Sequence, residues 1–183
     1  EGWAIPAKKD DRVIVGFRGE RLVAGIETGV VAQYHPMTDQ SDFPNFNLDL
    51  TQLGYHLKGE HVVGFWNESR LDIEQKGSEK PVRFDTVAGT DYTFAIGGGL
   101  HVLAEYFVSV RERQFTWVDR LNQRTIHMLG VSLDQPVGIA TVWRVFGFYD
   151  MRDGSFQVAP QIEYAVTNWA FLYLWGRWGG NVN

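Results

Sequence analysis

The segment that most constrains the fold is LHVLAEYFVSVR at residues 100–111. Every second residue from Leu100 to Val110 is apolar, whereas the other positions carry His101, Glu105, Ser109 and Arg111, with Leu103 and Phe107 among them. Because successive side chains of a β-strand point to opposite faces, this segment predicts a strand with one apolar and one charged face. An average globular strand has about five or six residues, whereas a tilted strand needs roughly 9–11 to cross a bilayer. The length and the strict alternation together are typical of transmembrane β-structure.

The same alternation recurs along the chain and predicts an all-β fold. We expect about ten strands, joined in sequence order as a transmembrane antiparallel up-and-down β-barrel. Residues 1–10 carry Pro6 and a cluster of charges, which favours an N-terminal loop or tail, and residues 11–183 form the expected barrel domain. The expected strands cover residues 11–18, 21–34, 46–57, 60–74, 81–96, 99–112, 123–134, 138–150, 155–167 and 169–178.

The connections between these strands alternate in length almost without exception. Bacterial outer-membrane barrels have short periplasmic turns and longer extracellular loops, so the alternation favours that location. A soluble β-sandwich has no physical reason to follow the same rule. The short connections are expected at residues 19–20, 58–59, 97–99, 134–137 and 167–168, and the longer ones at 35–45, 75–80, 113–122 and 151–154.

This alternation places both ends of the chain on the outer side of the membrane. If the turns at 19–20 and 167–168 are periplasmic, the first strand runs inward and the last runs outward. A complete barrel of this class begins and ends on the periplasmic side. We therefore expect the chain to be part of a larger barrel; the alternative is that one strand is miscounted.

Composition excludes several other classes of protein. The length of 183 residues suits one domain, and no run of about 18 apolar residues exists that would form a transmembrane helix. The net charge of −5 argues against a partner that is nucleic acid. The absence of cysteine excludes a disulfide scaffold and thiolate metal sites.

Catalytic patterns are also weak. The five histidines form no HExxH motif, and the chain has neither a GxSxG elbow nor a GxGxxG loop. Ser109 with His101 or His127 could be drawn as a nucleophile and base, but nothing in their spacing requires that arrangement. We expect a protein that is not an enzyme and that uses no cofactor and no metal.

Charged residues on the non-apolar faces of the strands are the candidate pore-lining residues. Opposed arginines and carboxylates can set the ion selectivity of a pore. The alternative is that they only cross-link neighbouring strands through salt bridges. The candidates are Glu27, Glu68, Arg70, Asp72, Arg83, Asp85, Asp91, His101, Glu105, Arg111, Arg144 and Glu163.

Aromatic residues near the strand ends are the candidates for interfacial girdles, because amphipathic rings favour the headgroup layer of a membrane. The alternatives are an ordinary aromatic core or a surface that stacks against carbohydrate, for which residues 168–178 are the best segment. The girdle candidates are Tyr34, Tyr55, Tyr92, Phe94, Phe148, Tyr149, Phe156, Trp169, Phe171, Tyr173, Trp175 and Trp178.

Two segments, GTDYTFAIGGGLHVLAEYFVSV (89–110) and PQIEYAVTNWAFLYLWGRWGG (160–180), resemble outer-membrane porin-like β-barrels of Gram-negative bacteria. The likeness is to the group that includes alginate-export-like and uncharacterised porins, and it is stronger after about residue 80. It implies a channel without cofactor, in contact with membrane lipid and with other barrel segments or subunits. The chain differs from that group because its last aromatic run, which ends at Trp178, is followed by GGNVN.

Three functions remain in competition. The first is a porin-like channel for small hydrophilic solutes or ions, with residues 35–45 and 113–122 best placed to constrict it. The second is a barrel that serves as a structural sleeve or scaffold in an outer-membrane complex. The third is a soluble β-sandwich that binds carbohydrate, with the same alternation but its apolar face turned inward.

Overall fold

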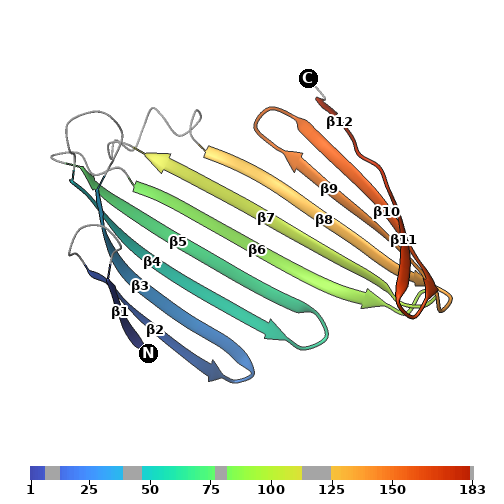
Figure 1. Cartoon of the computed structure of the whole chain (residues 1–183), viewed down its shortest axis with the longest axis horizontal. Helices are drawn as coiled ribbons and strands as arrows, with labels where there is room; N and C mark the ends of the chain where they lie inside the picture. The colour runs from blue at the N-terminus through green and yellow to red at the C-terminus, as the bar shows by residue number, and fades with distance from the viewer. Residues whose placement is uncertain (7–12, 39–46, 77–81, 113–124, 182–183) are drawn as a thin grey trace. The chain divides into compact units, whose positions relative to one another are not determined.

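The chain folds as β-structure alone in the part that this computed structural model describes, residues 1–6, 13–38, 47–76, 82–112 and 125–181 (Figure 1). These residues contain twelve strands and no helix. The strands are β1 (Gly2–Pro6), β2 (Val13–Val23), β3 (Ile26–Thr38), β4 (Asn47–Glu60), β5 (Gly64–Lys76), β6 (Val82–Phe94), β7 (Leu100–Glu112), β8 (Thr125–Val137), β9 (Thr141–Asp150), β10 (Ser155–Thr167), β11 (Ala170–Trp175) and β12 (Trp178–Asn181).

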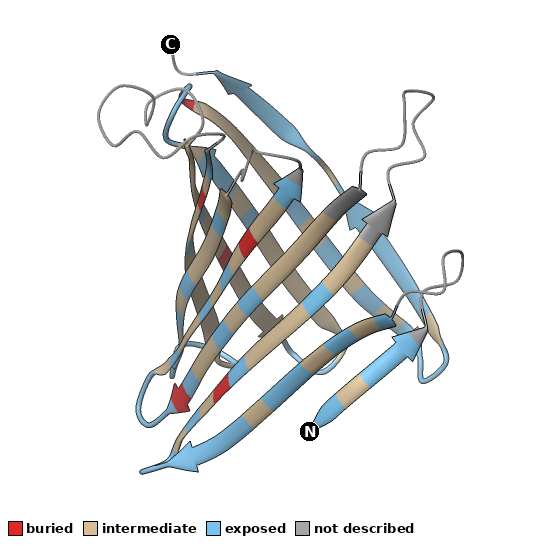
Figure 2. Cartoon of the chain, turned by 90° about the vertical axis from the view of Figure 1, so that its left-hand side faces the viewer, coloured by how far each residue is buried: buried red, intermediate tan, exposed pale blue. Residues whose placement is uncertain are grey.

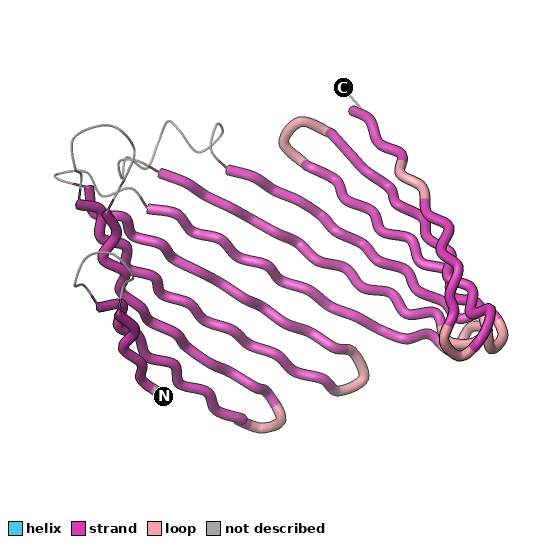
Figure 3. The backbone as a smooth tube through the Cα atoms, in the orientation of Figure 1, coloured by secondary structure: helices cyan, strands magenta, loops and turns pink. Residues whose placement is uncertain are grey.

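The strands pair in the order in which they occur in the chain, from β1 to β11 (Figure 3). The short strand β12 continues along the same side of β10 as β11, since Trp175 pairs with Gln161 and Trp178 pairs with Val158. This order confirms the predicted antiparallel up-and-down topology. Among the described strands β1 and β11 remain the two ends of the order, so the sheet is not closed into a barrel.

The chain divides into two compact units, and each strand from β4 to β8 contributes residues to both. Unit 1 comprises residues Glu1–Gly59, Trp66–Thr86 and Val108–Thr125. Unit 2 comprises Glu60–Phe65, Val87–Phe107 and Ile126–Asn183.

Large apolar side chains are exposed on one face of the sheet in each unit. In unit 1, Val30 pairs with Tyr55 across β3 and β4, and the two residues are 52% and 40% exposed. In unit 2, Ile162 pairs with Leu174 across β10 and β11, and these are 45% and 69% exposed. No apolar residue in the described segments is buried, and the few buried residues are isolated bands on the strands (Figure 2). We call the side that carries Val30, Tyr55, Ile162 and Leu174 the apolar face and the other side the polar face.

The N-terminal residues differ from the prediction of a loop or tail, because Gly2–Pro6 form β1; together with β12 at the other end of the sequence, this raises the strand number from about ten to twelve. Trp3 pairs with Gly16 of β2, and a β-carbon at Gly16 would overlap the Trp3 indole ring. The glycine therefore provides the space in which the tryptophan ring lies across the neighbouring strand. Pro6 is the last residue of β1, which is an edge strand of the described sheet, where proline is tolerated.

The first hairpin turn also differs from its predicted position at residues 19–20. Gly19 lies inside β2 and pairs with Val30, whereas Ala24 and Gly25 connect β2 to β3. Their φ angles are +52° and +82°, as a two-residue hairpin of type I′ requires.

Two other short connections were predicted too early in the chain. Residues 58–59 lie inside β4 and residues 134–137 inside β8, so the connections fall at 61–63 and 138–140. The turn predicted at 167–168 lies at 168–169, whereas those at 97–99 and 151–154 lie where they were expected. Most residues of the longer predicted connections at 35–45, 75–80 and 113–122 lie outside the described segments.

In the turn at 151–154, the backbone N–H of Ser155 donates to Asp153 Oδ1 over 2.9 Å. Hydrogen bonds from the side chain and the backbone of Ser155 hold the pKa of Asp153 below its usual value.

Across the described chain, no helix has the length and hydrophobicity that a membrane span would require.

Candidate functional site

The polar face carries all twelve of the predicted pore-lining residues. The alternation of side chains along each strand assigns these residues to the polar face. Residues that are two, four or six positions apart on one strand share a face, and each strand has at least one residue whose contacts identify that face. Glu27, for example, is six residues before Gln33 on β3, and Arg111 is two after Ser109 on β7. The structure brings most of these residues into two hydrogen-bonded networks, one in each unit.

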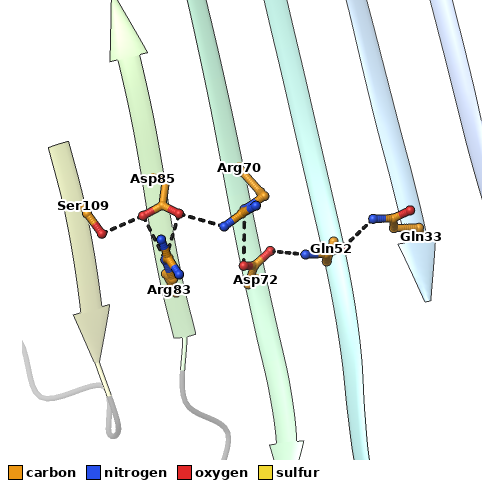
Figure 4. Close-up of polar contacts among 7 residues, drawn as sticks. All are labelled: Gln33, Gln52, Arg70, Asp72, Arg83, Asp85 and Ser109. Atoms are coloured by element: carbon orange, nitrogen blue, oxygen red, sulfur yellow. Dashed lines mark hydrogen bonds and ion pairs between the residues drawn. The ribbon is translucent and has the colours of Figure 1, made fainter. Parts of the chain in front are cut away.

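The first network, which we call the Asp85 network, crosses five strands of unit 1 from β3 to β7 (Figure 4). Asp85 of β6 is its centre, because it accepts from Ser109 Oγ over 2.6 Å and pairs with Arg83 at 2.8 Å. Arg70 of β5 pairs with Asp85 at 3.0 Å and with Asp72 at 3.3 Å.

Two glutamines extend the Asp85 network towards β3. Gln52 of β4 donates from Nε2 to Asp72 Oδ1 over 2.9 Å and accepts a hydrogen bond from Gln33 of β3. Asp72 is 7% exposed and the Asp85 side chain 12%, so these carboxylates are largely removed from solvent. Their arginine partners are needed because an unpaired buried carboxylate would be strongly destabilising.

The second network, the Asp134 network, crosses unit 2 from β6 to β10. Asp134 of β8 lies 3.8 Å from His101 Nδ1 and 3.2 Å from Arg144 Nε. His101 Nε2 is 3.4 Å from Asp91, and Arg144 pairs with Glu163 at 2.7 Å. Three carboxylates therefore share one guanidinium and one imidazole in this network.

The remaining predicted residues have different surroundings. Glu27 approaches His56 of β4 at 3.5 Å and belongs to a separate cluster near the first hairpin turn. Glu68 and Arg111 are exposed on the polar face, and Glu105 lies on that face between His101 and Ser109. The predicted set is therefore brought to one face, although not into one cluster.

Sequence reasoning missed several members of the two networks. The sequence predicts a turn at Asp134, because the strand expected at 123–134 ends there, and Gln33, Gln52 and Ser132 carry no charge that would mark them as candidates. Ser132 donates to Asp134 Oδ2 over 3.2 Å. The signal that could have found the uncharged residues is alternation itself, since Gln33 is in phase with Glu27, Gln52 with Lys58 and Ser132 with Asp134 on their own strands.

A few polar side chains lie on the apolar face and bond with one another. Ser69 Oγ is 2.8 Å from Thr86 Oγ1, and Asn67 Nδ2 donates to the same oxygen over 3.2 Å. Tyr106 Oη is 2.6 Å from His127 Nδ1. Mutual hydrogen bonding reduces the cost of placing such groups in apolar surroundings.

The predicted aromatic girdle divides between the two faces. Phe171, Tyr173 and Trp175 pair with Ala165, Glu163 and Gln161 of β10, and Phe148 pairs with Gln157, so these four rings lie on the polar face. Trp169 lies in the turn before β11. The remaining candidates lie on the apolar face, namely Tyr34, Tyr55, Tyr92, Phe94, Tyr149, Phe156 and Trp178.

Two pairs of rings on the apolar face lie near opposite ends of the strands. Tyr92 and Phe94 contact each other edge to face at 4.7 Å beside the short turn that follows β6. Phe156 and Trp178 do the same at 4.9 Å beside the turn that precedes β10. This placement is typical of rings at the two boundaries of a membrane.

No protein-family model matches the sequence, and neither a curated protein nor a solved structure does. The comparisons show no family. The resemblance to porin-like barrels therefore stays a hypothesis, which rests on the two faces of the sheet and not on a relative.

Proposed function

We propose that these strands form part of the wall of a transmembrane β-barrel in a bacterial outer membrane, and that this barrel is a porin-like channel. The apolar face contacts lipid, and the polar face lines a water-filled path for small hydrophilic solutes or ions. The observation that carries the proposal is the contrast between the two faces. One exposes large apolar side chains along most of its strands, whereas the other holds charged side chains paired across several strands, beside a smaller number of exposed rings such as Phe171 and Trp175.

Contact with lipid accounts for the exposed side chains of the apolar face better than contact with water does. Exposed apolar surface costs about 25 cal/mol per Å² in water, and a soluble β-sandwich avoids this cost by packing a second sheet on its apolar face. Within the described segments no apolar side chain is buried, so no such layer covers Val30, Tyr55, Ile162 or Leu174. This observation disfavours the soluble carbohydrate-binding sandwich.

The lengths of the strands agree with a bilayer. Strands β3, β5, β6, β7, β8 and β10 each have 13 residues, more than the roughly 9–11 that a tilted strand needs. They are also about twice the average length of strands in soluble proteins. Such strands can cross the hydrocarbon layer and extend into both headgroup regions.

The open sheet edges require further strands in this proposal. A sheet edge in lipid leaves backbone N–H and C=O groups unpaired, which costs several kcal/mol for each group. In the described sheet β1 and β11 are the edge strands. We therefore propose that strands from other barrel segments or subunits pair with these edges and close the barrel.

The test is the conductance of planar bilayers to which the purified protein is added in detergent. We expect discrete conductance steps, with a preference for cations because the Asp134 network has more carboxylates than guanidinium groups. The double variant Asp134→Asn/Glu163→Gln should insert equally well and lose most of that preference, as the reversal potential in a salt gradient would show.

The possible outcomes separate the three functions. A protein that inserts into vesicles but conducts no ions would contradict the channel and favour the structural sleeve. A protein that stays in water without detergent, and migrates identically on gels whether boiled or not, would contradict the membrane location.

A further inference from the structure

Three side chains with metal-binding atoms converge on the polar face next to the Ala24–Gly25 turn. They are Glu20 of β2, Glu27 of β3 and His56 of β4, and one ligand atom from each lies within 4.8 Å of the other two. His56 Nε2 is 3.5 Å from Glu27 Oε1 and 3.8 Å from Glu20 Oε1. The cluster belongs to neither of the two networks described above.

Gly29 makes this convergence possible. Gly29 of β3 pairs with Glu20 on one side and with His56 on the other, so the three residues form a row across three strands. A β-carbon at Gly29 would overlap the His56 imidazole. The ring therefore occupies the space above the glycine, and Glu27, two residues earlier on the same face, reaches it from the side.

The separations of the ligand atoms suit a bound metal ion better than direct hydrogen bonds. Zinc bonds to nitrogen and oxygen of about 2.0–2.1 Å at tetrahedral angles place neighbouring ligand atoms roughly 3.3–3.4 Å apart. His56 Nε2 is at least as far as that from each carboxylate, beyond the usual hydrogen-bond range of about 2.7–3.2 Å.

The surroundings of His56 Nε2 support the same reading. This atom is shielded from solvent and has no hydrogen-bond partner among the described residues. A shielded nitrogen without a partner costs about 1–3 kcal/mol. A cation held between this nitrogen and the two carboxylates would remove that cost.

We propose that Glu20, Glu27 and His56 bind a divalent transition-metal ion of the zinc type. Imidazole and carboxylate are ligands that Zn²⁺ accepts, and three protein ligands leave a position for water. The neighbouring cations are Arg18, whose Nε donates to Glu20 Oε1 over 2.8 Å, and Lys58, the cross-strand partner of Glu27. Arg18 competes with the metal ion for Glu20, so its removal strengthens binding. The site does not depend on the proposed channel.

The test is a titration of the untagged protein in detergent with two metals. Binding of ZnCl₂ is measured by calorimetry, and binding of CoCl₂ is measured by the visible absorption of tetrahedral cobalt. We expect one ion per chain. His56→Ala and Glu27→Gln should each weaken Zn²⁺ binding by roughly 100-fold or more and abolish the cobalt bands, since loss of an outer contact alone costs about 10–100-fold. Arg18→Ala should bind more tightly than the parent protein.

The controls are His101→Ala, a histidine between two carboxylates in the Asp134 network, and Glu68→Gln, an exposed carboxylate on the same face. Both should bind Zn²⁺ as the parent does. The proposal is overturned if the parent binds no Zn²⁺, or if His56→Ala and His101→Ala weaken binding equally. It is also overturned if binding occurs without tetrahedral cobalt bands, because the ion would then not be held by these three ligands and a water molecule.

Discussion

Replacing Ala88 with arginine is expected to lower the free energy of unfolding of the protein in lipid vesicles by about 2–4 kcal/mol. Ala88 lies midway along β6 on the apolar face and is exposed. Arginine on the lipid-facing side of a barrel strand costs about that much at the bilayer midplane. At an exposed site in water, the same substitution changes stability by no more than about 0.5 kcal/mol. Urea titration of the vesicle-bound protein, followed by tryptophan fluorescence, measures the difference.

The matched control at this site is Ala88→Leu, which adds a large side chain without charge. It should leave the stability in vesicles unchanged or raise it slightly, because leucine is as compatible with lipid as alanine is. If Ala88→Arg and Ala88→Leu unfold at the same urea concentration, the apolar face does not contact lipid.

Replacing Asp85 with alanine is expected to lower the free energy of unfolding by about 2–3 kcal/mol. Asp85 accepts from Ser109 and pairs with both Arg70 and Arg83, so its loss removes a partner from three polar groups, of which Arg70 keeps Asp72. Breaking a fully buried ion pair costs about 3–5 kcal/mol. The expected loss is smaller because the Arg70 and Arg83 side chains are 48% and 34% exposed, and water can solvate them.

The control for Asp85 is Glu68→Ala, which removes the same charge from an exposed position on the polar face of β5. We expect a change of less than about 0.5 kcal/mol for this variant. Equal losses for Asp85→Ala and Glu68→Ala would show that net charge, and not the network, determines the effect.

The sequence predicts the long strands well because alternation carries the information about them. The strand expected at 155–167 has the observed bounds of β10, and the strand expected at 99–112 begins one residue before β7. The two faces follow directly, since every second residue of each strand is apolar and most polar residues fall between them. For this reason the twelve predicted polar-face residues could be chosen without knowledge of the register.

Where apolar and polar residues do not alternate, the sequence carries less information about strand positions and faces. Strand β1 has five residues and is held against β2 partly by the packing of Trp3 over Gly16, a contact between positions that no local pattern connects. In β11 every residue from Phe171 to Trp175 is apolar, so the sequence does not show which rings lie on which face. The pairing with β10 decides it and places Tyr173 opposite Glu163.

The Asp85 network, the Asp134 network and the Glu20–Glu27–His56 cluster depend on which residues lie opposite one another on neighbouring strands. The sequence pattern of a single strand does not specify that pairing. Glu20, Glu27 and His56 come together because Gly29 pairs with both Glu20 and His56. A turn placed at 19–20 instead of 24–25 would separate these residues. The sequence also contains no cysteine, so single cysteines can be introduced as reporters of their surroundings.

The most direct test of the central claim, that one face meets lipid and the other meets water, is a cysteine scan along β7 in lipid vesicles. Because the chain has no cysteine of its own, single substitutions from His101 to Val108 can each be treated with a charged, water-soluble thiol reagent. We predict that positions 101, 103, 105 and 107 react and that positions 102, 104, 106 and 108 are protected. Equal reaction at both sets in vesicles, with folding confirmed by tryptophan fluorescence, would contradict the account.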